Sequence, residues 1–142
     1  MFEALIENVA RTLDRNGLPY MVIGGQAVLL YGEPRLTRDI DIALGVGLDG
    51  LPRVLSAARE ADLEVLVDPE SFTRKTMVLP CQDPRTDIRV DFILSFSPYE
   101  REALKRAQRI RFGATDVNFA SVEDLLIAKT VAGAFGTMPA PC

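Results

Sequence analysis

Two acidic residues, Asp39 and Asp41, alternate with isoleucines in the segment RDIDIAL, residues 38–44. If this segment is a β-strand, successive side chains point to opposite faces, so the two carboxylates share one face and the isoleucines the other. Neighbouring carboxylates repel each other, and one of them takes up a proton unless a cation lies between them. Because hard cations prefer oxygen ligands, the pair predicts a Mg²⁺ or Mn²⁺ site.

A third acidic residue, Asp91, has a similar setting in the segment DIRVDFIL, residues 87–94. It lies between Val90 and Phe92, as expected for an acid on the outer face of a half-buried strand. If the two strands pair side by side, three carboxylates converge. Acids that hold two divalent ions are suited to in-line phosphoryl transfer, in which one ion activates the attacking oxygen and both offset charge at phosphorus. An ordinary surface acid is the alternative.

A pair of glycines, Gly24 and Gly25, follows the short apolar segment YMVI and precedes a second one, QAVLLYG. Glycine lets backbone N–H groups approach a phosphate closely, and the N-terminus of a helix favours an anion. A short helix after the pair could return the chain to the two acids. The pair is therefore a candidate phosphate cradle, with an ordinary turn as the alternative.

The elements that must position these residues follow from the hydrophobic pattern. Helices are predicted over residues 2–15, 26–32, 48–63, 98–108 and 121–135, and strands over 20–25, 38–44, 64–67, 76–82, 87–94, 109–112 and 116–119. The segment DPRT, residues 83–86, predicts a tight turn between two strands, since Asp and Pro favour turns. Gly113 is expected at the turn of a small hairpin.

This irregular mixture of helices and strands favours an α+β fold, a small mixed β-sheet flanked by helices. A chain of 142 residues suits one domain, which we expect over residues 1–135. The last residues, 136–142, are rich in small residues and prolines, and we expect them to form a loose tail.

Composition excludes several kinds of chemistry. The sequence contains no histidine, which excludes His general bases, Ser-His-Asp and Cys-His nucleophiles and His-ligated zinc. Its two cysteines, Cys81 and Cys142, match no metal-site spacing and no disulfide framework. No apolar run approaches the roughly 20 residues that cross a bilayer, and the N-terminus lacks the layout of a signal peptide. A cytoplasmic location without a membrane partner is therefore expected.

The charge is acidic overall, with a formal net charge of -4, which argues mildly against a large RNA partner. One segment, YEREALKRAQRIRFG at residues 99–113, is basic instead. If this segment is helical throughout, Arg101, Lys105 and Arg109 form one stripe along it. The stripe is either a solvated helix face or a docking strip for a polyanionic acceptor such as tRNA.

Taken together, the motifs resemble the signature of the nucleotidyltransferase superfamily. The resemblance rests on VIGGQA at residues 22–27, on Arg35, Thr37, Asp39 and Asp41 in the run RLTRDIDI, and on VDFI at residues 90–93. The segment FASVEDLLIAK, which ends at Lys129, resembles a stretch that places a lysine near the site in minimal and abortive-infection-toxin-like members. The resemblance covers residues 20 to about 131 and implies the polymerase-beta-like fold.

The same resemblance implies a role for each residue. Asp39 and Asp41 would bind metal ions, and Asp91 would be a third ligand or the base toward the acceptor hydroxyl. Gly24 and Gly25, with Arg35 and Thr37, would hold the nucleoside triphosphate. Lys129 would act near the phosphates as a compact positive charge, and it completes a catalytic set with the three acids. Arg35 could instead be an ion-pair partner of an acid, Thr37 a strand former, and Lys129 a surface lysine.

The expected function is Mg²⁺-dependent transfer of a nucleoside monophosphate from a nucleoside triphosphate, such as ATP, to a hydroxyl acceptor, with release of pyrophosphate. The acceptor is open among an RNA end, a protein side chain and a small molecule. The resemblance also implies a toxin of a toxin–antitoxin pair, and hence an antitoxin partner. The alternative is a catalytically inactive nucleotide-binding or protein-interaction module of the same fold, truncated at its C-terminus. The apolar last helix further suggests a homo-oligomer.

Overall fold

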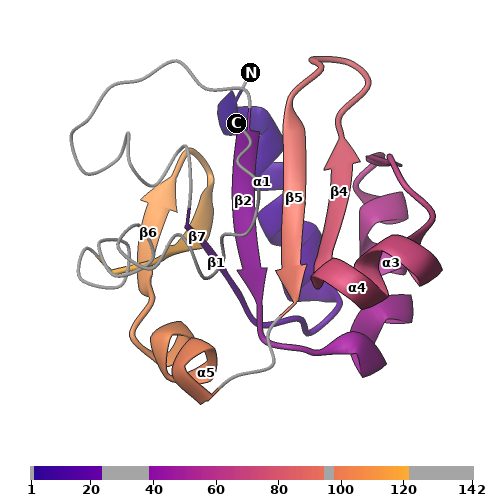
Figure 1. The fold of residues 1–142 in the computed structure, drawn as a ribbon. Coiled ribbons are helices and arrows are strands. Elements are labelled where there is room, and N and C mark those ends of the chain that lie inside the picture. Colours follow the sequence, from indigo (N-terminus) through magenta and orange to yellow (C-terminus); the bar gives the residue numbers. More distant parts are fainter. Residues whose placement is uncertain (1, 24–38, 95–97, 122–142) are drawn as a thin grey trace.

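The computed structural model describes residues 2–23, 39–94 and 98–121 of the chain (Figure 1). The elements in chain order are α1 (Phe2–Arg15), β1 (Tyr20–Val22), β2 (Asp39–Leu44), the 3-10 helix η1 (Leu48–Gly50), α3 (Leu51–Glu60), β3 (Glu64–Val65), the π-helix η2 (Pro69–Thr73), α4 (Arg74–Thr76), β4 (Val78–Gln82), β5 (Arg89–Leu94), α5 (Pro98–Lys105), β6 (Gln108–Phe112) and β7 (Thr115–Phe119). Most predicted elements are present, with ends that differ by a few residues.

The described strands form one mixed sheet in the order β3-β4-β5-β2-β1-β7-β6 (Figure 1). The pairs β2–β5 and β1–β7 are parallel, and the other neighbouring pairs are antiparallel. Together with its helices, this sheet confirms the predicted α+β fold class. The described helices include none that is long and apolar enough to cross a bilayer.

Helix α1 covers one face of the sheet because its apolar residues recur at helical spacing. Leu5, Ile6, Val9 and Leu13 are buried in the main hydrophobic core, together with residues of α3 and of the central strands. The helix ends where Gly17 adopts a positive φ of 67°, a conformation that glycine accepts without strain. The helix itself was predicted from the sequence, and its buried stripe fixes which face of the sheet is left for polar residues.

The turn between β4 and β5 is built around Asp83, whose side chain is buried. Its carboxylate accepts hydrogen bonds from Thr86 Oγ1 at 2.8 Å and from the backbone N–H of Arg85 at 3.4 Å. These local bonds confirm the turn predicted at DPRT. They also make β4 and β5 an antiparallel pair, which places β5 beside β2 in the interior of the sheet.

The predicted helical stripe in the basic segment is wrong. Helix α5 ends at Lys105, and Arg109 lies on strand β6. The segment turns because β6 pairs with β7, which places Ile110 opposite the buried Val117. Arg109 instead meets Asp14 at 3.5 Å, and its Nη1 donates a 2.9 Å hydrogen bond to Asn118. Three basic residues therefore do not form a single helix face here.

Several predictions lie outside the described residues: the helix over 26–32, nearly all of the helix over 121–135, and the tail over 136–142. The predicted helix over 48–63 is replaced by η1 and α3, since Pro52 stands in the first turn of a new helix. Cys81 is a buried core residue, as a lone cysteine on a strand would suggest.

Candidate active site

The candidate site lies on the face of the sheet opposite α1, where strands β2 and β5 run side by side. Their parallel register pairs Asp41 with Asp91 and Asp39 with Arg89. In neighbouring strands, directly opposite residues point to the same face. Asp39, Asp41 and Asp91 therefore share one face with Arg89, and the segments that carry them are far apart in the sequence.

The strands are held in this register by their other face. Ile40, Ile42, Val90 and Phe92 are almost fully buried in the main core. A shift of one residue would carry these apolar side chains to the polar face and the acids into the core. The apolar face of the two strands thus fixes where the carboxylates on the opposite face lie.

Toward the C-terminal end of β2, the face that carries the acids becomes apolar. Ala43, two residues after Asp41, packs in a second small cluster with Met21, Ala103 and Ala120. Ala103 belongs to α5, so this helix covers the C-terminal end of the polar face. The acids therefore lie in the N-terminal half of each of the strands β2 and β5.

Arg89 makes the closest contact within this group. Its Nη2 lies 2.9 Å from Asp91 Oδ1, with the Arg89 and Asp91 side chains 43% and 19% exposed. Its Nε is buried and has no hydrogen-bond acceptor. The sequence motifs assign no role to Arg89. Its position two residues before Asp91, on the same face of the strand, is the signal that could have found it.

The electrostatics of the site are dominated by crowded negative charge. Burial raises the pKa of Asp41 to about 6, and the Asp91 and Asp39 carboxylates add to this rise. Burial also raises the pKa of Asp91, which the hydrogen bond from Arg89 opposes. Among the described residues, the Arg89 guanidinium is the positive charge that acts on these carboxylates, and of Asp41 and Asp91 only Asp41 lacks a hydrogen bond from it that opposes the rise in its pKa.

Carboxylate oxygens in a crowded, partly buried group are donors that suit a hard divalent cation. Within the described ranges, however, no three Asp, Glu, Cys or His side chains are grouped so that they could hold a metal ion as they lie. Asp91 is instead engaged by Arg89. The chemistry of the donor set nevertheless fits a divalent cation.

The remaining predicted site residues, Gly24, Gly25, Arg35, Thr37 and Lys129, lie outside the described residues. The last described residue before the glycine pair is Ile23, whose backbone N–H donates a 2.8 Å hydrogen bond to the carbonyl of Asp41. The roles assigned to all eight predicted residues stay predictions.

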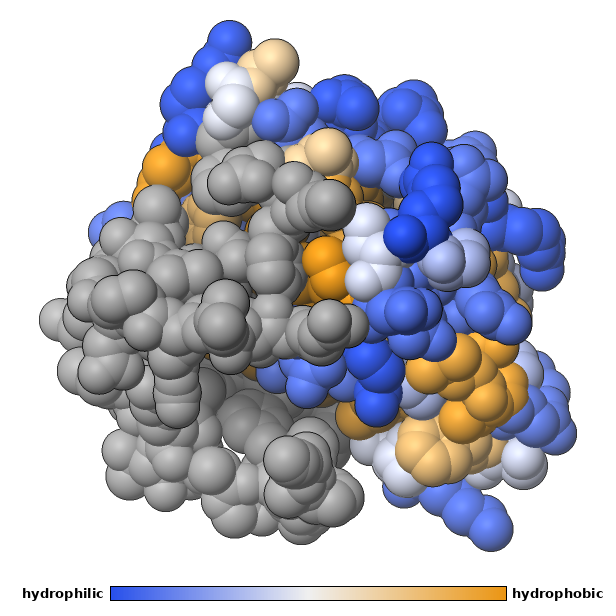
Figure 2. All heavy atoms as spheres, turned by 90° about the horizontal axis from the view of Figure 1, so that it is seen from above, coloured by the Kyte–Doolittle hydropathy of each residue, from blue (hydrophilic) through white to orange (hydrophobic). Residues whose placement is uncertain are grey.

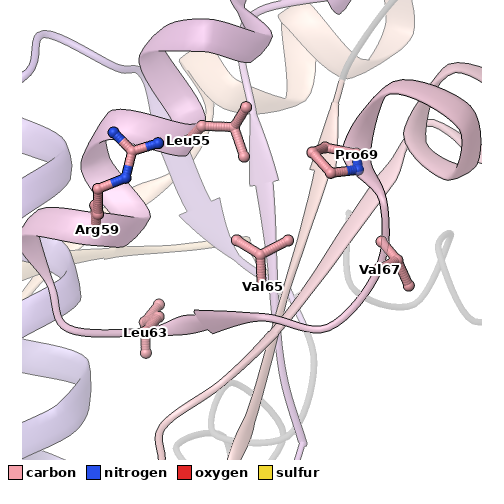
Figure 3. A pocket seen from close by; sticks show the side chains of 6 residues that line it. All are labelled: Leu55, Arg59, Leu63, Val65, Val67 and Pro69. Carbon is pink, nitrogen blue, oxygen red and sulfur yellow. The ribbon is translucent and has the colours of Figure 1, made fainter.

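Two cavities lined by described residues lie away from the acids. One of about 340 Å³ lies between α3 and the segment that carries β3 (Figure 3), lined by Leu55, Arg59, Leu63, Val65, Val67 and Pro69. Another of about 380 Å³ borders α1 and includes Asn8, Arg11 and Asp83. Figure 2 shows a largely hydrophilic described surface on the side seen from above. Neither cavity contains Asp39, Asp41 or Asp91.

With the fold and this acidic face in view, the chain was compared with known proteins. The model of the family described as "Nucleotidyl transferase AbiEii toxin, Type IV TA system" matches residues 13–138. The chain belongs to this family. The AbiEii family is one of nucleotidyltransferases, so the chain is a nucleotidyltransferase, as the motifs had led us to expect. No curated protein sequence matches the chain.

Solved structures agree on the fold of this AbiEii-family chain. The lincosamide antibiotic adenylyltransferase LnuA superposes with a TM-score of 0.61 at 12% identity, covering 87% of this chain and 83% of its own. The antibiotic-resistance factor ANT(2'')-Ia gives 0.66 at 16% identity, covering 99% and 76%. A putative nucleotidyltransferase from Thermotoga maritima gives 0.62 at 12% identity, covering 96% and 87%. At these identities the similarity is one of fold, and it confirms the polymerase-beta-like architecture.

Proposed function

We propose that this AbiEii-family chain transfers a nucleoside monophosphate from a nucleoside triphosphate to a hydroxyl acceptor, with Asp39, Asp41 and Asp91 holding Mg²⁺. The observation that carries the proposal is the parallel register of β2 and β5, which gathers the three acids on one polar strand face. The crowding seen in the raised pKa of Asp41 supports it, because a divalent cation would remove that crowding.

In the proposed reaction the acceptor oxygen forms a bond to the α-phosphorus, and the bond from that phosphorus to the bridging oxygen breaks. Pyrophosphate leaves with the electron pair of the broken bond. Mg²⁺ would supply charge neutralisation at the phosphates and a more acidic acceptor hydroxyl. Asp39 and Asp41 hold the cation, and Asp91 either completes its ligands or accepts the proton of the acceptor hydroxyl.

The nucleotide and the acceptor belong to the same proposal. Gly24, Gly25, Arg35 and Thr37 are proposed to hold the triphosphate, with Lys129 near its phosphates, all within the single domain proposed over residues 1–135. ATP is the first triphosphate to test, since one structural neighbour is a CCA-adding enzyme in complex with ATP. The family description further supports a role as the toxin of a toxin–antitoxin pair in the cytoplasm, where nucleoside triphosphates are available.

Two classes of acceptor stand out. A tRNA end remains a candidate, although the loss of the predicted basic stripe removes the main local argument for it. Small hydroxyl compounds are the second class, because neighbours of the same fold include lincomycin-bound LnuA and ANT(2'')-Ia with adenylyl-2''-tobramycin. These names describe the neighbours, and they define the acceptors with which to begin.

The test is incubation of the full chain with each α-labelled nucleoside triphosphate, Mg²⁺, and tRNA, lincomycin or tobramycin in turn. We expect label to move to one acceptor class with stoichiometric pyrophosphate, and the transfer to stop with EDTA. Asp39→Asn should abolish transfer, whereas Asp49→Asn, which changes an exposed aspartate on η1, should leave it unchanged. Transfer that survives Asp39→Asn would exclude the proposed site.

A further inference from the structure

The position of Arg89 within the acidic face gives it a part in the site. It lies opposite Asp39 in the register of β2 and β5, and two residues before Asp91 on the same strand. Within the described residues, its hydrogen-bonded contact is with Asp91 Oδ1 at 2.9 Å. Arg89 therefore lies on the same strand face as the three acids and is in contact with one of them.

Arg89 differs from a structural arginine of the same chain. The Arg53 guanidinium donates to two backbone carbonyls, those of Asn16 at 3.0 Å and Gly17 at 3.2 Å, and so links the end of α1 to α3. Among the described residues, Arg89 has no such set of carbonyl partners, and its buried Nε meets no hydrogen-bond acceptor there. The Asp91 carboxylate orients the guanidinium of Arg89. The same contact occupies the carboxylate of Asp91.

We propose that Arg89 is a positioning residue that holds the Asp91 carboxylate in the metal-free enzyme and competes with the divalent cation for it. This inference rests on the proposed function of the site. Two observations support it: Asp91 is paired with Arg89, and the acids of the described residues are not grouped so that they could hold a metal ion as they lie. Binding of the cation then requires Arg89 to release Asp91.

The test measures Mn²⁺ binding to the full chain by electron paramagnetic resonance, without nucleotide. Arg89→Met keeps the length of the side chain and removes the charge and the hydrogen bond. We expect the Mn²⁺ dissociation constant to fall by about tenfold, as removal of one nearby charge under partial solvent screening predicts. Arg89→Lys keeps the charge but loses the planar guanidinium fork. Its Mn²⁺ dissociation constant should lie between those of Arg89→Met and the wild type.

A matched control is Arg74→Met. Arg74 makes a contact of the same 2.9 Å length with Glu70, on an exposed helix turn away from the acids. This change should leave the Mn²⁺ dissociation constant as it is in the wild type. An equal gain in Arg74→Met would mean that the effect is one of overall charge and would overturn the inference.

A second arm shows whether Arg89 acts through Asp91. We expect the gain from Arg89→Met to shrink in an Asp91→Asn background, since the carboxylate for which Arg89 competes is then gone. A gain of the same size in both backgrounds would overturn the inference, as would a folded Arg89→Met variant that binds Mn²⁺ no more tightly than the wild type. If Arg89→Met does not fold, Arg89→Lys in the two backgrounds decides in the same way.

Failure of the inference and failure of the proposed function are distinguishable. If the wild type binds Mn²⁺ and Asp41→Asn does not, the metal site stands whatever Arg89 does. If neither binds Mn²⁺, both the metal site and the role of Arg89 are excluded.

Discussion

The two faces of the β2–β5 pair are made by the same two strands but differ in chemistry: one is apolar and the other is acidic. On one face Ile40, Ile42, Val90 and Phe92 are packed into the main core. On the other, Asp39, Asp41 and Asp91 share one strand face with Arg89, which pairs with Asp91. The first face stabilises the fold and the second destabilises it. The packing of the apolar face fixes the strand register that gathers the acids. The gathering of acids does not stabilise the fold, so we explain it by function.

The largest expected effect comes from breaking the acidic face at its most crowded point. Asp41→Asn should lower nucleotidyl transfer by about a thousandfold or more, because a ligand of the proposed cation is lost. The fold should persist, since the neutral side chain relieves repulsion. Initial rates and circular dichroism check the two halves of this prediction. Full activity in Asp41→Asn would mean that the acids do not act as a metal site.

Breaking the apolar face should have nearly as large an effect, on stability instead of chemistry. Phe92→Ala removes a side chain that is only 1% exposed and should lower the free energy of unfolding by about 3–5 kcal/mol. Ile93→Ala, one residue later on the opposite face, is the control and should cost clearly less, because Ile93 is only partly buried. Urea denaturation of the metal-free variants measures both. An equal loss of unfolding free energy in the two variants would contradict the interpretation that the apolar face is the one that stabilises the fold.

A smaller effect, dependent on pH, sharpens the comparison. The folded-state pKa of Asp41 is raised from 3.8 to about 6, so between these values the folded chain binds more protons than the unfolded chain. Its destabilising contribution, on the order of 2 kcal/mol, is therefore full above about pH 6 and disappears as the pH falls toward 4. In EDTA, Asp41→Asn should be more stable than the wild type at pH 7.5.

Thermal melts of both proteins between pH 4.5 and 7.5 check this prediction, because most other titrating groups cancel in the difference. The gap should close toward pH 4.5. With Mg²⁺ at pH 7.5 the order should reverse, since only the wild type keeps all three carboxylates. A gap that does not change with pH would show that Asp41 is not crowded.

The smallest expected effect concerns charges that lie away from both faces. Arg109 is 52% exposed and pairs with Asp14 and Asp116 at 3.5 and 3.9 Å. Exposed pairs of this kind contribute little, so Arg109→Ala should lower stability by less than about 1 kcal/mol. Because Arg109 is not part of a helical stripe, tRNA binding measured by filter retention should also be unchanged. A large loss of binding would restore the strip as an RNA surface.

The sequence allowed some parts of this arrangement to be predicted and not others. The alternation of Asp39 and Asp41 with isoleucines predicts a shared face, because strand periodicity is a local property. That Asp91 lies directly beside Asp41 is not local: it depends on a parallel register between distant strands, which core packing sets. The helical stripe of the basic segment was wrong because Arg109 belongs to β6, which pairs with β7 as the predicted strands over residues 109–112 and 116–119 imply.

The parallel pairing of β2 with β5 also affects when the enzyme comes into existence. Asp39 and Asp41 are synthesised well before Asp91, and the hairpin from β4 must deliver β5 before the two strands can meet. A nascent chain that has not yet exposed β5 outside the ribosome can therefore use only two of the three acids. For this nucleotidyltransferase of the AbiEii family, the three acids can therefore gather only after β5 has been synthesised.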